Sequence, residues 1–431
     1  MKKNVVLVIG GGGRESTLVH KYSHSPQVSK ILSIPGNDLM QINSRVPVKI
    51  YPQIKTTDIE QILKVCKKKN VDLVDVAIDA AVEAGVADEV EKLGIMAVGP
   101  SKLAGQIEWD KAYARDFMKK YKIPQPKFEI FNSQSKGKAY IKKQKEGKWF
   151  IKANGLVDGK GALSANNKKH ALERISEMSR FGKMGETFLI EEWLEGEEFS
   201  TFIISDGKTY QIVGSAQDHK RMYTGDLGEN TGGMGCSAPP LLVTPQLLKL
   251  VDKTIIKKTL DGLKKEGRPF KGVLYLGGIV VAGKPFVIEF NARWGDPEAE
   301  VIIPGIQNDL FEIGKAISLE KLSSLKIKTD NKYRIAVAFA LRPDPTEGRE
   351  FFGIDKARKV TGVTIYNSRV QKKGKKYFSQ AGRQLFIVAE GRNVIEAREK
   401  VYQAASFIFI EGNNHIFRTD IGWRDVNRVN K

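Results

Sequence analysis

The sequence predicts an α/β protein that begins with a doubly wound parallel sheet and continues into further mixed domains. Short apolar runs alternate with helix-like segments near the start, which is the pattern of parallel strands joined by helical crossovers. The chain has 431 residues, more than one ordinary core fills, so two to four domains are expected. Hydrophobic residues make up 41% of it. Since no run reaches roughly 18 apolar residues, we expect a globular protein with no membrane partner.

The first domain is expected at residues 1–103. Its strands are the apolar runs at residues 4–9, 31–34, 71–78 and 95–98, and its helices follow Gly13 and span 58–69 and 82–93. The basic and apolar start is similar to a signal peptide, but glycines follow at once and no cleavage site is present. A buried first strand is therefore the better interpretation.

The second domain is expected at residues 104–325, and a third, strand-rich domain at 326–431. Within the second, residues 124–191 are expected to form a small, strand-rich and mobile lid. They join a lysine-heavy stretch to a glycine-rich loop at 155–161, and such loops are commonly functional. Helices are expected over 245–266 and 308–318.

The net charge indicates which ligands the protein binds, and the cysteines indicate the compartment in which it works. Lys and Arg number 70 against 50 Asp and Glu, a net charge of +20 that favours anions such as nucleotides and phosphorylated metabolites. No zinc-finger spacing or aromatic–basic RNA motif is present, so we expect a solvated lysine-rich surface and no nucleic-acid partner, with polyanion binding as the alternative. Cys66 and Cys236 lie far apart and match no metal-ligand spacing, which indicates a reduced, cytoplasmic protein.

The glycine loop VIGGGGRES follows the first strand and opens the first helix, so its backbone N–H groups and the helix N-terminus suit an anion. The dinucleotide fingerprint fails, because Glu15 stands at its third glycine and no acidic residue ends the second strand. We expect a phosphate-bearing small molecule bound by Gly12, Gly13, Arg14 and Asn37. A plain strand–helix turn is the alternative.

Polar groups also gather in KPFVIEFNARWGDPEAE, residues 284–300, where an apolar strand ends. Glu289 and Asn291 share one face of this strand, because residues i and i+2 point the same way. A carboxylate and an amide oxygen suit a hard cation such as Mg²⁺. Arg293 and Asp296 follow at once.

Several weaker signals indicate a nucleotide, although no P-loop motif is present. Lys152 ends an apolar strand and either meets an anion or extends along an edge to solvent. The flap 155–161 could close over phosphates, and LIEEWLEGEE at 189–198 is similar to a strand running into a hinge. The polar, glycine-rich stretch at 215–235 has the profile of a functional loop. Its His219 is a general base or only a supporting group.

In their order and spacing, these motifs resemble those of the phosphoribosylamine–glycine ligases, also called glycinamide ribonucleotide synthetases, of the ATP-grasp superfamily. The motifs are GGGGRES, PGN, IKANGLVDGKG, IEEWLEGEE, QDHKR, ENTGGMG, IEFNARWGDPE and RTDIGWR. The resemblance implies an ATP-grasp fold over nearly the whole chain. It also implies ATP-dependent ligation of glycine to 5-phosphoribosylamine through a glycyl phosphate, in purine biosynthesis, with Mg²⁺ or Mn²⁺ as the metal.

The resemblance implies a role for each group of residues. The metal ligands would be Glu289 and Asn291. ATP would be bound by Lys111, Lys152, Gly155, Gly159, Lys160, Gly161, Glu191, Leu194, Glu198 and Asn230, with Glu191 and Leu194 at adenine and Glu198 at the ribose. The catalytic residues would be Arg293, Asp218 and Asp296. The substrates would be bound by Gly12, Gly13, Arg14, Asn37, Asp79, Lys220 and Thr231.

The sequence departs from the family pattern on the amine-substrate side. The departures are Glu15-Ser16-Thr17, the strand end at 77–82, residues 341–345 and the turn at 380–383. Asp79 keeps the carboxylate of the strand end but is one methylene shorter than the usual glutamate. Two alternatives therefore stand beside the ligase, namely a related ATP-grasp ligase with another amine acceptor and a non-catalytic nucleotide- or polyanion-binding protein. We expect a monomer that binds small molecules.

Overall fold

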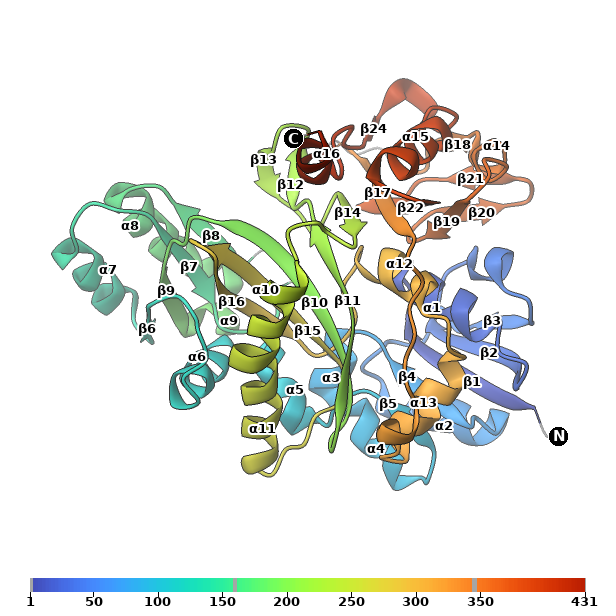
Figure 1. The fold of residues 1–431 in the computed structure, drawn as a ribbon, viewed down its shortest axis with the longest axis horizontal. Coiled ribbons are helices and arrows are strands. Elements are labelled where there is room, and N and C mark those ends of the chain that lie inside the picture. Colours follow the sequence, from blue (N-terminus) through green and yellow to red (C-terminus); the bar gives the residue numbers. More distant parts are fainter. Residues whose placement is uncertain (1–2, 158–160, 343–346, 431) are drawn as a thin grey trace.

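A five-stranded parallel sheet opens the chain in the computed structural model, which describes residues 3–157, 161–342 and 347–430. Its strands lie in the order β3-β2-β1-β4-β5, and Figure 1 shows helices packed around them. The strands are β1 Asn4–Gly10, β2 Val28–Pro35, β3 Val48–Ile50, β4 Leu73–Val76 and β5 Met96–Val98. The helices are α1 Gly13–Tyr22, α2 Ile59–Lys69, α3 Asp79–Ala84 and α4 Val86–Lys92. The predicted doubly wound sheet is confirmed.

Two details of this sheet differ from the prediction. The short strand β3 was not expected, because its three residues carry no clear apolar run. The helix expected over 82–93 begins earlier and breaks in two at Gly85, whose φ of 88° lies in the left-handed region that favours glycine. Since ligands bind outside the carboxyl ends of such strands, Gly12, Asn37 and Asp79 all follow strand ends at the expected binding edge.

Residues 124–191 form the subdomain at the left of Figure 1, a four-stranded sheet in the order β6-β9-β7-β8 with helices beside it. Its elements are β6 Phe128–Phe131, α7 Gln134–Lys143, β7 Trp149–Ala153, β8 Ala162–Ala165, α8 Lys168–Ser176, α9 Lys183–Glu186 and β9 Phe188–Glu192. The expectation of a strand-rich lid was wrong, because more of its residues are helical than extended. The lysine-heavy stretch forms α7, which buries Gly137 and Ile141 at helical spacing against Phe188.

A nine-stranded sheet runs through the rest of the molecule. Its order is β16-β15-β10-β11-β14-β17-β22-β19, with β24 also paired to β17. These strands are β10 Glu197–Asp206, β11 Tyr210–Asp218, β14 Gly235–Ala238, β15 Lys271–Val281, β16 Lys284–Asn291, β17 Tyr333–Leu341, β19 Val363–Asn367, β22 Arg383–Gly391 and β24 His415–Ile416. Because β14 pairs with β17, one sheet crosses the boundary expected at residue 325. That boundary stays a prediction.

The remaining elements surround these sheets. Between the parallel sheet and the lid lie α5 Lys102–Trp109 and α6 Lys111–Lys120. The nine-stranded sheet is flanked by α10 Pro245–Val251, α11 Lys257–Lys265, α12 Ala299–Ile302 and α13 Leu310–Ser318, and the loop after β11 holds β12 Arg221–Tyr223 and β13 Leu227–Asn230. The C-terminal part adds α14 Ile354–Ala357, α15 Val394–Ala405, α16 Trp423–Val429 and a second small sheet, β18 Glu350–Phe352, β20 Gln371–Lys373, β21 Lys376–Phe378 and β23 Phe409–Ile410.

The apolar cores explain how the site is assembled. One cluster joins Ile9 and Val76 of the parallel sheet to Phe290 of β16, so the ends of these strands are held near one another. The lid has a cluster of its own around Ile151 and Phe188, and the C-terminal part has another. Within the described ranges, no helix is long and apolar enough to cross a membrane.

Candidate functional site

Lys152 is held at the end of β7 by a chain of buried charges. Its Nζ lies 2.7 Å from Glu191 Oε2, and the other side of that carboxylate accepts from Arg115 Nε at 2.7 Å. Burial raises the pKa of Glu191, but Arg115 and Lys152 outweigh it and bring the value to about 2. Two cations share one anion, so the cluster keeps a net positive charge. Arg115 was not predicted, because nothing in its helical surroundings sets it apart.

Lys111 begins α6 close to the same charges, and its Nζ donates to the Gly155 carbonyl at 2.9 Å. Burial lowers its pKa, the Glu289 carboxylate raises it, and the nearby Lys152 lowers it further. The Met184 side chain packs over Gly155 and would have to move if this glycine carried a side chain. Gly161 accepts from Ala153 N–H at 2.9 Å, whereas Gly159 and Lys160 lie outside the described residues.

Glu289 and Asn291 stand at the end of β16, as predicted. Lys220 Nζ lies 3.9 Å from Glu289 Oε1 and 3.3 Å from Glu198 Oε2. Burial raises the pKa of Glu289, but Lys220 and the other two ammonium groups hold it below its usual value. Asn291 Oδ1 accepts from Arg293 NH2 at 3.1 Å, while its buried Nδ2 has no partner among the described residues.

The donor set fits a divalent cation that also binds phosphate. Mg²⁺ typically takes one or two protein oxygens and completes its shell with water and substrate phosphates. Glu289 and Asn291 offer that number, and no group of three acidic, histidine or cysteine side chains suited to a metal is found among the described residues. With three ammonium groups around Glu289, a bare cation would be repelled. The residues therefore fit a metal that arrives with a polyphosphate.

Arg293 connects the metal edge to the parallel sheet. Its NH2 lies 2.9 Å from Glu108 Oε1 and 4.0 Å from Asp79 Oδ2, and its buried Nε has no partner in the described part of the chain. Burial opposes the charge, but Glu108 and Asp79 raise the pKa above the usual range, so the guanidinium stays charged. Glu108 was not predicted, although Lys111 follows it closely, because a single glutamate near the end of a helix carries no pattern of its own.

Asp218 lies in a buried acidic pair with Glu298. Burial and the charge of Glu298 raise the pKa of Asp218 well above its usual value, and no described residue forms a hydrogen bond with its Oδ1. Glu298 accepts from Tyr275 OH at 2.7 Å and from Ser200 Oγ at 3.2 Å. Asp296 is placed differently, since its Oδ1 lies 3.0 Å from Arg383 NH2. Asp218 is thus the unsatisfied member of this group.

The loop after β11 carries the remaining predicted residues. Thr231 donates from both its N–H and its Oγ1 to the Lys220 carbonyl, at 2.8 and 2.9 Å, and so fixes the loop behind Lys220. Asn230 is exposed and opposes Arg221 in a short ribbon. His219 is buried and its Nε2 accepts from the Gly422 N–H at 3.4 Å. Burial and nearby arginines lower its pKa to about 3, which favours the supporting role over a general base.

The glycine loop lies against the segment that follows β16. Arg14 NH1 donates to the Trp294 carbonyl at 3.0 Å, and a side chain at Gly12 would come within 3.2 Å of Asp296 Oδ2. Glu15 accepts from the Gly12 N–H at 2.6 Å, so this carboxylate caps α1. The structure therefore brings the predicted sugar-phosphate loop to the predicted catalytic segment. A side chain at Gly13 would collide with Glu300.

Asn37 has a structural use. Its Nδ2 donates to the Gly11 carbonyl and to Ser16 Oγ, both at 2.9 Å, and its Oδ1 accepts from Asn367 Nδ2 at 2.9 Å. It thereby fastens the glycine loop to β19. Leu194 is half-buried between β9 and β10, next to a stacked pair that the sequence did not single out, Phe150 and Trp193, with ring centroids 4.6 Å apart.

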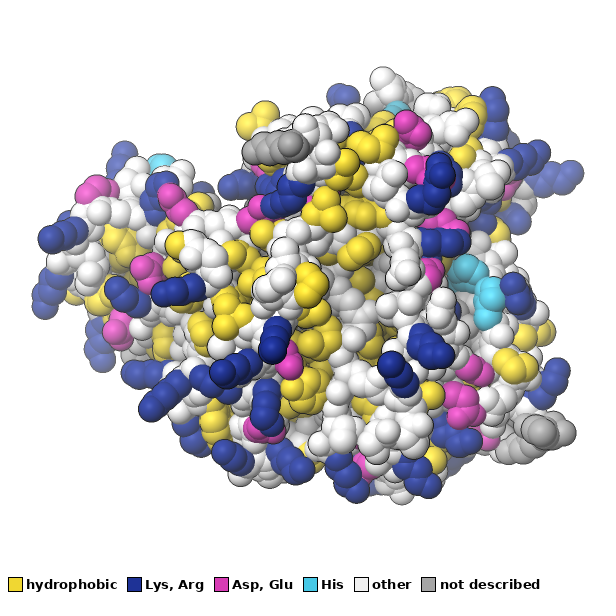
Figure 2. All heavy atoms as spheres, in the orientation of Figure 1, with side chains coloured by type: hydrophobic (Ala, Val, Ile, Leu, Met, Phe, Trp, Pro, Cys, Tyr) yellow, Lys and Arg dark blue, Asp and Glu magenta, His cyan; other side chains and the backbone are white. Residues whose placement is uncertain are grey.

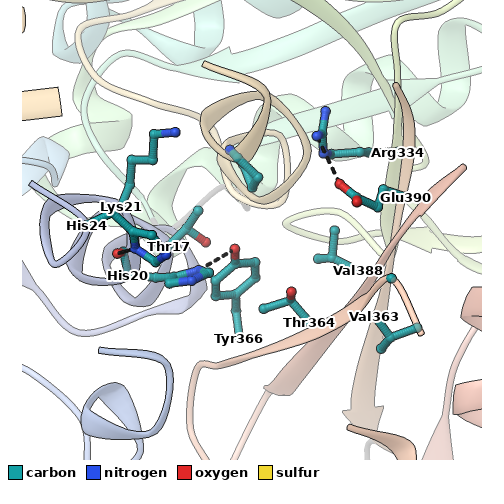
Figure 3. A pocket seen from close by; sticks show the side chains of 12 residues that line it. Thr17, His20, Lys21, His24, Arg334, Val363, Thr364, Tyr366, Val388 and Glu390 are labelled. Atoms are coloured by element: carbon teal, nitrogen blue, oxygen red, sulfur yellow. Dashed lines mark hydrogen bonds and ion pairs between the residues drawn. The ribbon is translucent and has the colours of Figure 1, made fainter. Parts of the chain in front are cut away.

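A separate cavity of about 310 Å³ lies between α1 and the strands β19 and β22. Figure 3 shows the His20 ring and the Tyr366 hydroxyl pointing toward each other, with His20 Nδ1 3.0 Å from the oxygen. Burial lowers the pKa of His20 to about 4, so its ring is neutral near pH 7. Arg334 pairs with Glu390 on the other side at 3.1 Å. Because this cation is already neutralised, we assign no ligand to the cavity.

The lid, the nine-stranded sheet and the cation cluster between them define an ATP-grasp protein. Three models of the phosphoribosylglycinamide synthetase family match in sequence, namely the N domain at residues 4–108, the ATP-grasp (A) domain at 109–299 and the C domain at 343–424. The chain belongs to the phosphoribosylglycinamide synthetase family. The family and the fold predicted from the motifs are thereby confirmed.

Individual relatives agree with this assignment. A phosphoribosylamine–glycine ligase of Streptococcus pneumoniae is 36% identical over 427 residues, covering 98% of this chain and 99% of the relative. One from Chlorobaculum tepidum is 35% identical over 425 residues, covering 97% and 99%. The human trifunctional purine biosynthetic protein adenosine-3 is 34% identical over 429 residues. This chain spans only 42% of the length of that longer protein.

Solved structures show the same fold. The phosphoribosylamine–glycine ligase of Thermotoga maritima has a TM-score of 0.80 at 28% identity and covers 97% of this chain and all of its own. The biotin carboxylase domain of Hydrogenobacter thermophilus 2-oxoglutarate carboxylase, crystallised with MgADP, has a TM-score of 0.74 at 16% identity, covering 96% and 92%. At that identity the second similarity concerns the fold alone.

Proposed function

We propose that this protein ligates glycine to 5-phosphoribosylamine, using ATP. The γ-phosphoryl group of ATP goes to a glycine carboxylate oxygen, giving glycyl phosphate and ADP. The amine then attacks the acyl carbon, gives up a proton and displaces phosphate, leaving glycinamide ribonucleotide. The observation that carries the proposal is the convergence of Lys111, Lys152 and Lys220 on Glu289, near the segment against which the glycine loop packs.

The cation cluster suits the ATP phosphates. Lys152 keeps surplus positive charge after Glu191 is shared with Arg115. Burial lowers the pKa of Lys111, and the nearby Lys152 lowers it further. A phosphate between them would relieve this repulsion. The flap that begins at Gly155 would then close over the phosphates. Leu194 and the hinge would meet adenine, whereas the Glu191 carboxylate is engaged in ion pairs.

Glu289 and Asn291 would hold Mg²⁺ or Mn²⁺ between the protein and ATP. When bound, the metal would neutralise charge on the transferring phosphoryl group. Arg293 stays charged beside Asn291 and would stabilise the acyl phosphate and the transition state that precedes it. Enclosure under the lid would also exclude water from the acyl phosphate.

Asp218 suits the amino group of glycine. Its Oδ1 has no hydrogen-bond partner among the described residues, and its raised pKa indicates that Lys220 and Arg383 only partly offset burial and the charge of Glu298; an ammonium group would add to them. The sugar phosphate would lie at Gly12, Gly13 and Arg14, and Asp79 would face the ribosyl amine. Asp296 would orient the substrates from the segment between these two sites.

The experiment that tests this function is an ADP-release assay with ATP, Mg²⁺, glycine and freshly generated phosphoribosylamine, each omitted in turn. Release that requires all four supports the ligase. Release that ignores phosphoribosylamine but requires an amino acid would instead favour an ATP-grasp ligase with another amine acceptor. The altered strand end around Asp79 motivates this second candidate, and a panel of amines would then identify the acceptor.

We further propose that the protein is a monomer and works in the cytoplasm. Both cysteines, Cys66 and Cys236, are buried and free, which supports a reduced cytoplasmic enzyme. Purine biosynthesis needs small, diffusible substrates, so we propose a monomer that works without a membrane. Sedimentation of the purified protein at micromolar concentration would test the monomer.

A further inference from the structure

The small antiparallel sheet β20-β21-β18-β23 has one buried and one open face. Residues paired across adjacent strands point to the same side, so the register assigns each residue to a face. One row, Phe351, Tyr377 and Ile410, is buried in the C-terminal core. The residues that precede and follow these three along their strands therefore lie on the opposite, open face of the sheet.

The open face carries aromatic rings. Phe352 and Phe409 oppose each other there, 36% and 52% exposed, with ring centroids 4.9 Å apart and planes at 20°. Phe378 lies on the same face, because it opposes Glu350, two residues before Phe352. Of the exposed large apolar side chains among the described residues, Phe352 and Phe409 are two that lie in contact with each other on one face of a sheet.

Lysines border these rings. The segment QKKGKKYF at 371–378 holds four lysines and no acidic residue, and all four are exposed. The register places Lys373 and Lys376 on the open face, with Lys373 Nζ 5.4 Å from the centre of the Phe378 ring. Lys376 pairs with Glu350 at 2.8 Å. In Figure 2, dark-blue side chains project from this hairpin at the upper right, far from the lid.

We propose that this open face docks single-stranded nucleic acid, with bases stacked on Phe352 and Phe409 and phosphates bound by the lysines of the β20–β21 hairpin. Aromatic rings on an open antiparallel sheet, bordered by cations, accept any base because every base has a π-face. The net charge of +20 adds long-range attraction for a polyanion. A membrane fits less well, because the exposed apolar surface consists mainly of two rings that stack on each other, which leaves little area to bury in a lipid layer.

This surface is independent of the ligase site. It uses no residue of the nucleotide or substrate cluster, so it stands whether or not the proposed reaction is correct. It also escapes motif searches, because its rings and lysines come from three separate segments around residues 352, 371–378 and 409. Only the folded sheet brings them together.

The test is fluorescence anisotropy of the full chain with a labelled 12-nucleotide oligo(U) and oligo(dT), over a range of salt concentrations. The double variant Lys373→Glu/Lys375→Glu should weaken binding about tenfold or more and flatten the salt dependence. Its matched control is Lys67→Glu/Lys68→Glu, which makes the same charge change on exposed residues of α2 and should weaken binding by less than about twofold.

A second pair of variants separates stacking from simple apolar contact. Phe352→Leu/Phe409→Leu keeps apolar area but removes the rings, so it should weaken oligonucleotide binding by about five- to tenfold and leave the salt dependence unchanged. Equal losses for both lysine pairs, no oligonucleotide binding, or equal binding of duplex and single strand would overturn the proposal. Binding to phosphatidylserine vesicles that survives the leucine changes would show a membrane surface in its place. Circular dichroism confirms that each variant is folded.

Discussion

Lys152 and Glu191 form a buried ion pair at 2.7 Å, and the same carboxylate also accepts from Arg115. The pair joins β7 to β9 inside the lid, while Arg115 reaches it from α6 and donates to the carbonyls of Val287 and Ile288 in β16. One glutamate thus fixes Lys152, which we propose faces the ATP phosphates, relative to the strand that carries the predicted metal ligands. From this relationship we infer that Glu191 is a positioning residue.

Glu191→Gln should therefore lower both stability and the affinity for ATP. The change leaves two cations buried around a neutral amide, which typically costs about 3–5 kcal/mol of unfolding free energy. Urea unfolding and the KM for ATP measure the two effects. The matched control is Glu195→Gln, which removes only an exposed pair with Lys148 and should change neither quantity. Equal behaviour of the two variants would contradict the positioning role.

Glu289→Gln should abolish ADP formation and leave the fold intact. Glu289 loses its attraction to the surrounding lysines when it becomes an amide, but it is partly exposed, so water limits the cost in stability while the anionic donor is removed. Electron paramagnetic resonance of Mn²⁺ with a non-hydrolysable ATP analogue should show weaker metal binding. Turnover at the original rate would remove Glu289 from the metal site.

Asp79→Ala should raise the KM for phosphoribosylamine more than the KM for ATP. Asp79 begins α3 at the binding edge of the parallel sheet, and its carboxylate lies 4.0 Å from Arg293. Because Arg293 also contacts Glu108 and Asn291, some loss of kcat is expected as well. If neither KM changes, this strand end is not the amine pocket.

Local pattern was enough to predict the parallel sheet and the polar strand ends. Buried parallel strands are continuous apolar runs, and glycine loops follow them, so β1, β2, β4 and β5 were all recognisable. The alternation of side chains along a strand likewise predicts that Glu289 and Asn291 share one face of β16. These features depend on residues close in sequence.

What could not be predicted depends on contacts between distant segments. Arg115 and Glu108 meet the site from helices whose sequences look ordinary, and Arg383 reaches Asp296 from the C-terminal part. Helices were missed in the lid because α7 combines many lysines with few apolar residues. Packing of α7 on Phe188 supplies the stability that the apolar pattern of this helix does not provide.

His219→Gln should keep most of the ligase activity, because the histidine is buried and hydrogen-bonded to Gly422 rather than placed as a base. It should also change the response to acid. The folded pKa is about 3 against 6.5 in the unfolded chain, so protons bind the unfolded state first as pH falls. His219 therefore costs about 2 kcal/mol of unfolding free energy by pH 5. A plot of unfolding free energy against pH, from pH 8 to 5, should therefore be flatter for the variant than for the parent. A loss of activity of more than about tenfold would instead support His219 as the general base.

Asp75→Asn should have the opposite pH dependence. Burial raises the pKa of Asp75 to about 7, although Tyr22 OH donates to its Oδ2 at 2.7 Å and lowers the value somewhat. Between pH 4 and 7 the folded state keeps a proton that the unfolded chain has released, so stability falls as pH rises through this window. The asparagine removes this effect, because it is neutral at every pH and still accepts a hydrogen bond from Tyr22.

At pH 8 the Asp75→Asn variant should be more stable than the parent by up to about 4 kcal/mol, while at pH 4 the two should be similar. Urea unfolding at both pH values measures the difference, and Glu195→Gln serves again as the exposed control. An equal difference at both pH values would mean that Asp75 titrates normally, and its hydrogen bond to Tyr22 would then be the whole of its role.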